Sequence, residues 1–282
     1  VRNYGFEAML SYGHRWGDFS WDSSFTFSAN KNEIVELVKD YVHPETGKTY
    51  NVDKLELKTD EGRGFGKAKF ILKEGGTLGD LYTHADLKRD INGNILIDDS
   101  GNVTAIDNAG DIKLGSVLPK ANLAWNNSFS YKGINAGFLL TARLGGIVYS
   151  ATQAYLDLYG VSETSAAARD AGGVWVNGRS RVNPQSFYEV VASQSGLPTY
   201  YTYSATNLRL QEAHIGYTIP RRWLGNVCDI NVSLVGRNLW MIYCKAPFDP
   251  EAVATTNNYY QGIDYFMMPS TRNIGFNIKI NF

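Results

Sequence analysis

The last ten residues of the chain alternate strictly between apolar and polar side chains. The apolar positions are Ile274, Phe276, Ile278, Ile280 and Phe282, and Asn, Gly or Lys stands between them. This period of two predicts a β-strand with one apolar and one polar face, because successive side chains of a strand point to opposite sides. A soluble sandwich can contain such a strand. A bacterial outer-membrane barrel requires it, because its outside contacts lipid and its lumen is polar.

The same alternation recurs along the chain in pairs of segments joined by tight connections. The first two segments are about eleven residues long, which fits a tilted membrane strand better than the roughly five to six residues of a soluble one. A weaker hairpin is expected at residues 64–72 and 77–84. The nine expected strands are residues 4–12, 19–29, 64–72, 77–84, 122–131, 134–145, 207–219, 228–240 and 270–282.

The connections between these strands alternate between short and long. The short ones are residues 15–17, 73–76, 132–133 and 220–227, and the long ones are about 31–62, 85–118, 147–206 and 240–269. Outer-membrane barrels have short periplasmic turns and long outer loops, whereas a soluble β-protein has no reason to sort its loops in this way. Aromatic residues such as Trp21, Tyr131 and Trp223 fall toward the short turns, where an aromatic girdle belongs. The pattern predicts an all-β, antiparallel transmembrane β-barrel.

The odd number of expected strands indicates that this sheet does not close on itself. Single-chain bacterial barrels usually have an even number of strands with both ends in the periplasm. An open edge in lipid would leave backbone groups unpaired at several kcal/mol each. No signal peptide is visible and the first residue is Val1. We therefore expect residues 1–282 to be one unit, the C-terminal portion of a larger barrel.

Composition excludes several other classes of protein. The formal net charge of −1 argues against a nucleic-acid partner, and no apolar run approaches the ~20 residues of a membrane-spanning helix. Cys228 and Cys244 would lie at opposite ends of one strand, too far apart for a disulfide, and are expected to be free thiols. The Asp and Asn residues at 90–99 lack the glycine and glutamate of an EF-hand loop and are expected to be turn residues. No catalytic triad, phosphate loop or zinc spacing appears.

Several segments resemble signatures of the SusC/RagA-type TonB-dependent outer-membrane transporters. Residues 207–220 (NLRLQEAHIGYTIP) resemble the family's LRL…LGYTLP signature, and residues 235–240 (VGRNLW) with 248–251 (FDPE) resemble the element that follows it. Arg237 stands where the family more often has Gln. Weaker matches in the same order are residues 1–7 (VRNYGFE), 115–120 (GSVLPK), 127–132 (NSFSYK), 155–160 (YLDLYG) and 168–173 (ARDAGG).

The resemblance implies the fold and activity of a much longer protein. It implies a barrel of about 22 strands with a plugged lumen, whose N-terminal plug and TonB box are absent from this chain. It also implies import of oligosaccharides or peptides across the Gram-negative outer membrane, energised through TonB. A SusD-like lipoprotein would cover the outer loops. Such an importer is not an enzyme and needs no cofactor.

Candidate substrate-binding residues follow from the long loops and from the polar strand face. Ligand pockets combine aromatic faces with a few convergent polar groups, and the alternation places Glu212 and His214 on the polar face together with two arginines. The candidates are Trp175, Tyr200, Tyr201, Tyr203, Tyr259, Tyr260, Arg143 and Arg237. The simpler interpretation of the aromatic residues is packing between loops. The loop at 147–206 is also expected to contain short helices near residues 152–158, 162–170 and 184–193.

Three alternatives remain open on the sequence alone. An autonomous porin or adhesin-like barrel would need an even number of strands. An outer-membrane enzyme would need an acid–base constellation at the barrel rim. A soluble β-sandwich binding module is disfavoured by strand length and by the sorting of the loops.

Overall fold

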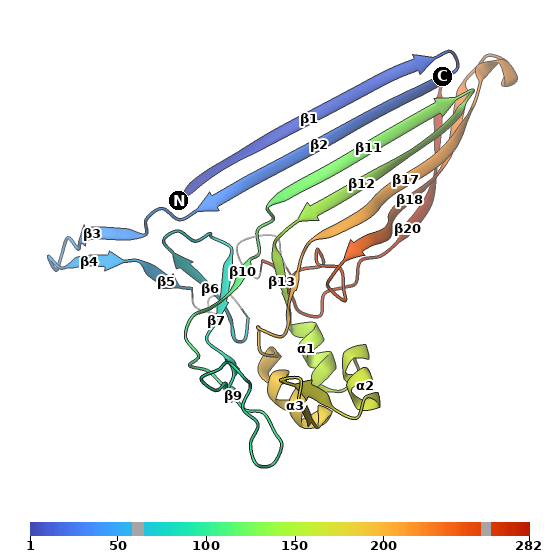
Figure 1. The fold of residues 1–282 in the computed structure, drawn as a ribbon. Helices are drawn as coiled ribbons and strands as arrows, with labels where there is room; N and C mark the ends of the chain where they lie inside the picture. The colour runs from blue at the N-terminus through green and yellow to red at the C-terminus, as the bar shows by residue number, and fades with distance from the viewer. Residues whose placement is uncertain (58–64, 255–260) are drawn as a thin grey trace.

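The computed structural model describes residues 1–57, 65–254 and 261–282. Its main feature is one seven-stranded antiparallel sheet with strand order β1-β2-β11-β12-β17-β18-β20 (Figure 1). The strands are β1 (Arg2–Trp16), β2 (Phe19–Glu33), β11 (Ala121–Tyr131), β12 (Ile134–Leu144), β17 (Asn207–Ile219), β18 (Asp229–Cys244) and β20 (Asn273–Asn281). Strands β1 and β20 are each paired on one side only, so the sheet is open.

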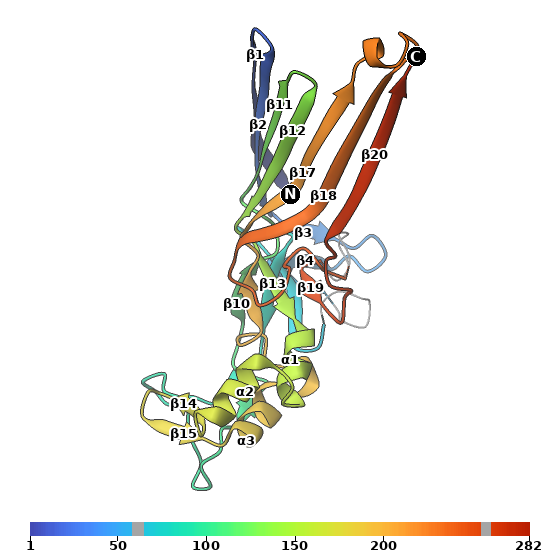
Figure 2. The ribbon, with the colours of Figure 1, turned by 90° about the vertical axis from the view of Figure 1, so that its right-hand side faces the viewer.

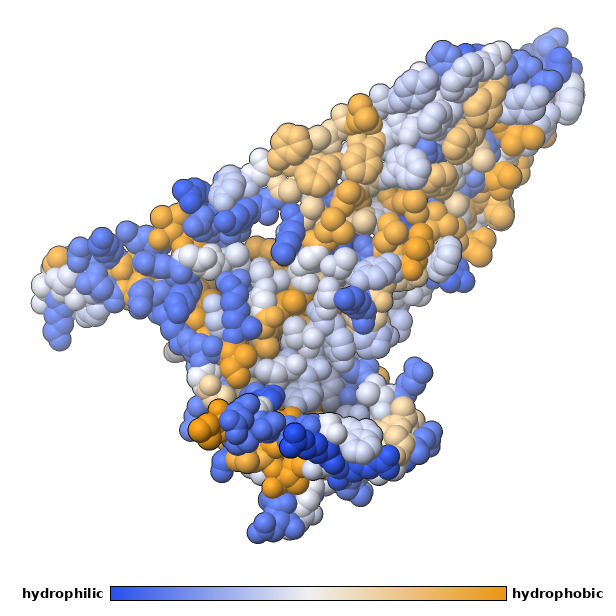
Figure 3. Space-filling view, viewed as in Figure 1, coloured by the Kyte–Doolittle hydropathy of each residue, from blue (hydrophilic) through white to orange (hydrophobic). Residues whose placement is uncertain are grey.

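Strand register collects the apolar positions of all seven strands on one face. Leu10 lies opposite Phe25, Phe25 opposite Trp125, and Trp125 opposite Leu140. Large apolar side chains on this face are exposed, Phe276 by 79% and Leu10 by 74%. Figure 3 shows hydrophobic side chains spread over this part of the sheet. An apolar surface of this extent is foreign to a soluble monomer and suits a lipid environment.

Two polar residues on the apolar face each accept a hydrogen bond from an indole group, although the Asn127 amide nitrogen has no partner among the described residues. Asn127 is almost fully buried there, and its Oδ1 accepts a hydrogen bond of 3.0 Å from Trp21 Nε1. Its cross-strand neighbour Ser23 accepts one of 3.0 Å from Trp125 Nε1. A buried polar group costs free energy unless it is hydrogen-bonded, and here tryptophan supplies both the bond and the apolar cover.

The opposite face of the sheet is polar. It carries mainly Ser, Thr, Asn and Gly, and it includes Arg143, Glu212, His214 and Arg237, as the alternation predicted. His214 packs over Gly137, where a Cβ atom would lie 2.6 Å from the imidazole. The class predicted from the sequence, an antiparallel sheet with opposite chemistry on its two faces, is therefore confirmed.

Short and long connections lie at opposite ends of the sheet. The turns β1–β2, β11–β12 and β17–β18 are at one end with the C-terminus, and the long connections are at the other end with the N-terminus (Figures 1 and 2). The turn between β17 and β18 contains a 3-10 turn at Arg221–Trp223. Three of the four short connections predicted from the sequence therefore lie together, whereas the fourth, residues 73–76, belongs to the loop side.

The hairpin expected in the main sheet at residues 64–84 is wrong as a pair of barrel strands. Strands β6 (Ala68–Lys73) and β7 (Asp80–Thr83) belong to a separate sheet on the loop side, and β11 pairs directly with β2. Adjacent residues Phe70 and Ile71 are both buried, as is all of β7, so neither strand has a face for lipid. Among the residues that the structure describes, the main sheet therefore has seven strands rather than nine, and β2 and β11 are joined by one long connection.

The loop side folds into small sheets and three short helices with a common hydrophobic core. Helices α1 and α2 start at capping serines, Ser150 and Ser162, and α3 starts at Asn183 followed by Pro184. The helices are α1 (Ala151–Leu158), α2 (Glu163–Asp170) and α3 (Pro184–Val191), followed by a 3-10 turn at Ser193–Ser195. The three helices predicted for this connection are confirmed.

The small sheets of the loop side are short and irregular. They comprise β3 (Val38–Val42) with β4 (Thr49–Val52); β5 (Lys54–Glu56), β6, β7 and β10 (Ile112–Ser116); β8 (Asp86–Leu87) with β9 (Ala105–Ile106); β13 (Ile147–Ser150) with β16 (Thr202–Ser204) and β19 (Ile263–Asp264); and β14 (Val174–Val176) with β15 (Ser180–Val182). The buried core, which includes Phe70, Tyr149 and Leu197, lies in these loops rather than against the main sheet.

Among the residues that the structure describes, no helix is long and apolar enough to span a membrane.

Candidate functional site

Four of the predicted site residues line one pocket in the loop side. Trp175, Tyr200, Tyr201 and Tyr203 surround a cavity of about 310 Å³, which we call the loop pocket. Its walls come from the hairpin at residue 95, from helices α1, α2 and α3, and from β14 and β16. These segments are far apart in the sequence and are brought together by the shared hydrophobic core.

Tyr201 forms the floor of the loop pocket and is held by Asp157. Its exposure is 2%, and its hydroxyl donates a hydrogen bond of 3.0 Å to Asp157 Oδ2. Asp157 Oδ1 accepts from Gln153 Nε2 at 3.1 Å and from the Ser162 hydroxyl. Burial, with the adjacent carboxylate, raises the pKa of Tyr201 well above its usual range. This network fixes Tyr201 to α1. It also supplies hydrogen bonds to Asp157, whose carboxylate lines the loop pocket.

The other aromatic residues offer neutral hydroxyls and flat apolar faces. Burial raises the pKa of Tyr203 to about 12 and also raises the pKa of Tyr200, so both phenols are neutral at physiological pH. Trp175 is 56% exposed, and the Arg181 guanidinium lies 4.5 Å from the centre of its ring. The loop pocket can therefore stack against a ring or apolar chain and exchange hydrogen bonds with an uncharged polar group.

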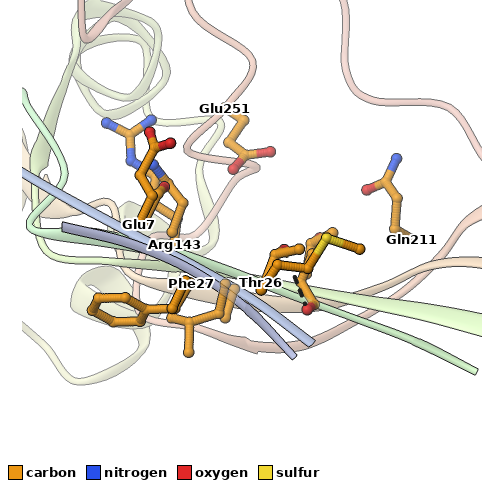
Figure 4. Close-up of a pocket in the computed structure, with 14 residues that line it drawn as sticks. Glu7, Thr26, Phe27, Arg143, Gln211 and Glu251 are labelled. Carbon is orange, nitrogen blue, oxygen red and sulfur yellow. Dashed lines mark hydrogen bonds between the residues drawn. The ribbon is translucent and has the colours of Figure 1, made fainter. Parts of the chain in front are cut away.

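A second pocket, of about 740 Å³, lies on the polar face of the sheet near the loop side. Its charged lining residues are Glu7, Arg143 and Glu251, which lie together on one side of the strands while Phe27 points to the other (Figure 4). Arg143 Nη2 donates to the Val117 carbonyl at 2.7 Å. We call this the polar-face pocket. Sequence alternation found Arg143 but gave no sign that Glu251 would fold back over it.

The remaining predicted site residues lie elsewhere. Arg237 is on the polar face but outside both pockets, where its Nε donates to Glu212 Oε2 at 3.0 Å and the guanidinium stays exposed. Tyr259 and Tyr260 lie outside the described residues. The structure thus groups Trp175 with three tyrosines and separates them from both arginines.

A buried ion pair that sequence reasoning missed anchors the last long connection to β17. Arg209 Nη2 lies 2.6 Å from Asp249 Oδ1 and 3.2 Å from Glu251 Oε2, and Nη1 donates to Asn238 Oδ1 at 3.1 Å. Burial alone would raise the pKa of Asp249, but the hydrogen bonds from Arg209, from the Glu251 backbone N–H and from Ser270, together with the positive charge of Arg209, outweigh burial and hold the pKa below its usual value. Because Glu251 also lines the polar-face pocket, this ion pair positions part of that pocket.

The two cysteines are free, as predicted. Within the described part of the chain, no group of three or more His, Cys, Asp or Glu side chains is arranged to hold a metal ion.

The chain is similar over its full length to TonB-dependent receptors. No family model matches it. TonB-dependent receptors P3, P26 and P39 of Formosa agariphila are 24%, 25% and 24% identical over 99%, 100% and 100% of this chain. This chain spans only 29–30% of the length of these relatives.

Two solved structures share the fold. The RagAB peptide importer in its closed-closed state matches 99% of this chain at 17% identity with a TM-score of 0.65. A structure of the RagAB peptide transporter matches at 16% identity with a TM-score of 0.63, and each match covers 29% of that longer chain. The resemblance to SusC/RagA-type transporters that the sequence motifs indicated is confirmed, and the relatives are named as receptors and transporters rather than enzymes.

Proposed function

We propose that residues 1–282 form the C-terminal wall and outer loops of a Gram-negative outer-membrane importer that is energised through TonB. The observation that carries the proposal is that the seven-stranded sheet has exposed apolar side chains on one face and polar side chains on the other. Folded loops lie at one end of this sheet. This is the arrangement that a barrel wall between lipid and a polar lumen requires. Similarity to TonB-dependent receptors and to RagAB supports it.

The other parts of the proposed importer would lie in the rest of a longer protein and in its partners. The relatives are more than three times as long as this chain, which leaves room for the other strands of a barrel of about 22 strands, a plug and a TonB box. A SusD-like surface lipoprotein would cover the loop side. Strands β1 and β20 each present an open edge, and further strands on both sides would satisfy their backbone groups.

The cargo we propose is an oligosaccharide or a peptide that contacts both pockets. Trp175, Tyr200 and Tyr203 offer aromatic faces and neutral hydroxyls, which suit a sugar ring or an uncharged side chain. Arg143, on the polar face below, would contact the cargo as it passes toward the lumen. Tyr201 contributes through its position in the pocket floor, and Tyr259, Tyr260 and Arg237 remain further candidate contacts.

The test is nutrient uptake by the full-length receptor. A strain lacking the gene should fail to grow on one class of oligosaccharides or peptides, and the wild-type gene should restore growth. A Trp175→Ala receptor should need more cargo for the same growth rate, because stacking area is lost. Trp223→Ala, a change at the opposite end of the sheet, is the matched control. Cargo recovered chemically altered by the purified receptor, or normal growth of the deletion strain on every substrate class, would contradict the proposal.

A further inference from the structure

The barrel wall has a gap at its loop-side rim, next to the end of β2. Pairing between β2 and β11 stops at Ser28 and Asn122, whereas pairing between β2 and β1 continues to Arg2 and Glu33. Residues 29–33 therefore extend beyond the strand that covers the rest of β2. A hollow of about 1040 Å³ opens at this point, and we call it the rim slot. Figure 3 shows the surface hollowed beneath this end of β1 and β2.

Most side chains that line the rim slot are apolar or small. Phe6 and Ala29 come from the apolar face of β1 and β2, and Leu118, Pro119 and Ile147 come from the opposite wall. Gly145 has a φ of +75°, and a Cβ atom at this position would lie 2.8 Å from Lys120 Cγ, so a larger residue would collide with the Lys120 side chain. Because Phe6 and Ala29 share the exposed apolar face of the sheet, the slot is continuous with that face.

Basic side chains gather around the rim slot. Lys31 lies opposite Tyr4, with its Nζ 5.6 Å from the centre of the Tyr4 ring, and Arg2 lies 5.7 Å from the same ring. Lys120 lines the opposite wall. Among the described residues, Lys31 and Lys120 form no ion pair, whereas Arg2 pairs with Glu33 at 2.9 Å.

The acidic groups nearby offset only part of this charge. Glu33 is hydrogen-bonded to Arg2 and also attracts Lys31, and Glu7, which also lines the slot, belongs to the polar face of β1 together with the polar-face pocket. Three basic side chains, Arg2, Lys31 and Lys120, stand against these two carboxylates, so an excess of positive charge remains at the rim for an anionic group.

We propose that the rim slot binds a phosphate-bearing membrane lipid, with an acyl chain in the apolar hollow and the phosphate between Lys31 and Lys120. This inference rests on the proposed function, because it requires the apolar face to be in lipid. At the loop-side rim the head-group layer begins, and long basic side chains extend into that layer while their stems stay on apolar surface. An apolar slot with a cationic rim complements an acidic phospholipid and not a free anion, which would leave the hollow empty.

The experiment measures lipid retention by the full-length receptor in detergent. Native mass spectrometry counts bound lipid after incubation with equal amounts of phosphatidylglycerol and phosphatidylcholine of identical acyl chains. We expect the wild type to retain phosphatidylglycerol preferentially. Lys31→Gln combined with Lys120→Gln should reduce that preference by about fivefold per lysine. Ala29→Trp, which fills the slot without changing charge, should reduce retention of both lipids.

The matched control is Lys132→Gln. Lys132 Nζ lies 5.3 Å from the Tyr131 ring and 3.8 Å from Asp18 Oδ2 in the turn between β11 and β12, and it does not line the rim slot, so this change should leave lipid retention unaltered. The inference would be overturned if the wild type retained the two lipids equally, or if Lys132→Gln lost as much lipid as the double lysine variant. Displacement of the lipid by inorganic phosphate would also overturn it. Heat-modifiable migration on a gel reports barrel folding separately. A folded receptor without lipid preference contradicts only the lipid site, whereas a receptor that never inserts contradicts the proposed function.

Discussion

Arg209 on β17 and Asp249 in the connection before β19 form an ion pair with 2.6 Å between Nη2 and Oδ1, and both side chains are almost fully buried. The pair joins two segments that the sequence showed only as separate motifs, residues 207–220 and 248–251. It ties the last long connection to the wall at the place where Glu251 reaches the polar-face pocket.

Removing Arg209 should therefore destabilise the loop side. Arg209→Met leaves the buried Asp249 carboxylate without its cationic partner, which costs about 3–5 kcal/mol for a buried pair. Thermal unfolding and limited proteolysis of residues 245–272 in the full-length receptor would measure the loss. Adding Asp249→Leu to the same variant should recover part of the stability, because no unpaired charge remains.

The exposed pair Arg237 and Glu212 is the matched control for this change. Its geometry is similar at 3.0 Å, but solvent screens it, so Arg237→Met should cost about 0–1 kcal/mol at most. Equal losses for Arg209→Met and Arg237→Met would show that burial of the Arg209 pair has no energetic consequence.

The Arg209–Asp249 pair should give the last connection a characteristic pH dependence. The pKa of Asp249 is lower in the folded protein than its usual value, so the pair contributes its full stability above the unfolded value of about 3.9. That contribution is lost as the pH falls through the lowered folded pKa. Protection of residues 245–272 from proteolysis should stay constant between pH 5 and pH 8 and decrease only in more acidic solution. Loss of protection near pH 6 would contradict this assignment.

The hydrogen bond between Trp21 and Asn127 should stabilise the lipid-facing surface. Trp21→Phe keeps the ring but leaves Asn127 Oδ1 without its donor, at a cost of about 1–3 kcal/mol for a buried unsatisfied group. Urea unfolding of the receptor in liposomes would measure it. Combining Trp21→Phe with Asn127→Leu should restore most of the stability, and failure of the double variant to improve on the single one would contradict the role of the bond.

Gly196 should be intolerant of substitution because it lies against the floor of the loop pocket. Its φ is +88°, and a Cβ atom would lie 2.4 Å from the Tyr201 ring and 2.7 Å from Ala154 Cβ. Gly196→Ala should cost about 1–3 kcal/mol from overpacking in addition to backbone strain. Gly178 also has a positive φ, +66°, but nothing lies within 4 Å of its Cβ position, so Gly178→Ala should show the strain alone. Equal unfolding temperatures for the two variants would contradict the packing argument.

The main sheet could be predicted from the sequence because lipid imposes a simple rule on it. Each strand of the wall must alternate apolar and polar residues. The sequence alone therefore places Ile278 on the apolar face and Asn277 on the polar face. Periodicity misplaces the hairpin at residues 64–84 because most of β6 and all of β7 are buried or half-buried without alternation. Their apolar residues belong to a core that includes distant residues such as Tyr149 and Leu197, which periodicity does not encode.

The candidate site could be predicted only in part for the same reason. Sequence composition pointed to Trp175 and the tyrosines near residue 201, but Asp157, which holds Tyr201, is 44 residues away along the chain. Arg209 and Asp249 are 40 residues apart and carry no local pattern. Contacts between irregular loops depend on the whole fold, whereas strand faces depend on immediate neighbours.

The most direct test of the account is the side of the membrane wall on which the side chains of β20 lie. Spin labels placed singly at residues 274–279 of the full-length receptor in liposomes report collisions with oxygen, which concentrates in lipid, and with a water-soluble nickel chelate. We predict high oxygen accessibility at Ile274, Phe276 and Ile278 and high nickel accessibility at Gly275, Asn277 and Lys279, with a period of two. Uniform accessibility along the strand, or alternation of the opposite phase, would contradict the claim that the apolar face of this sheet is in contact with lipid.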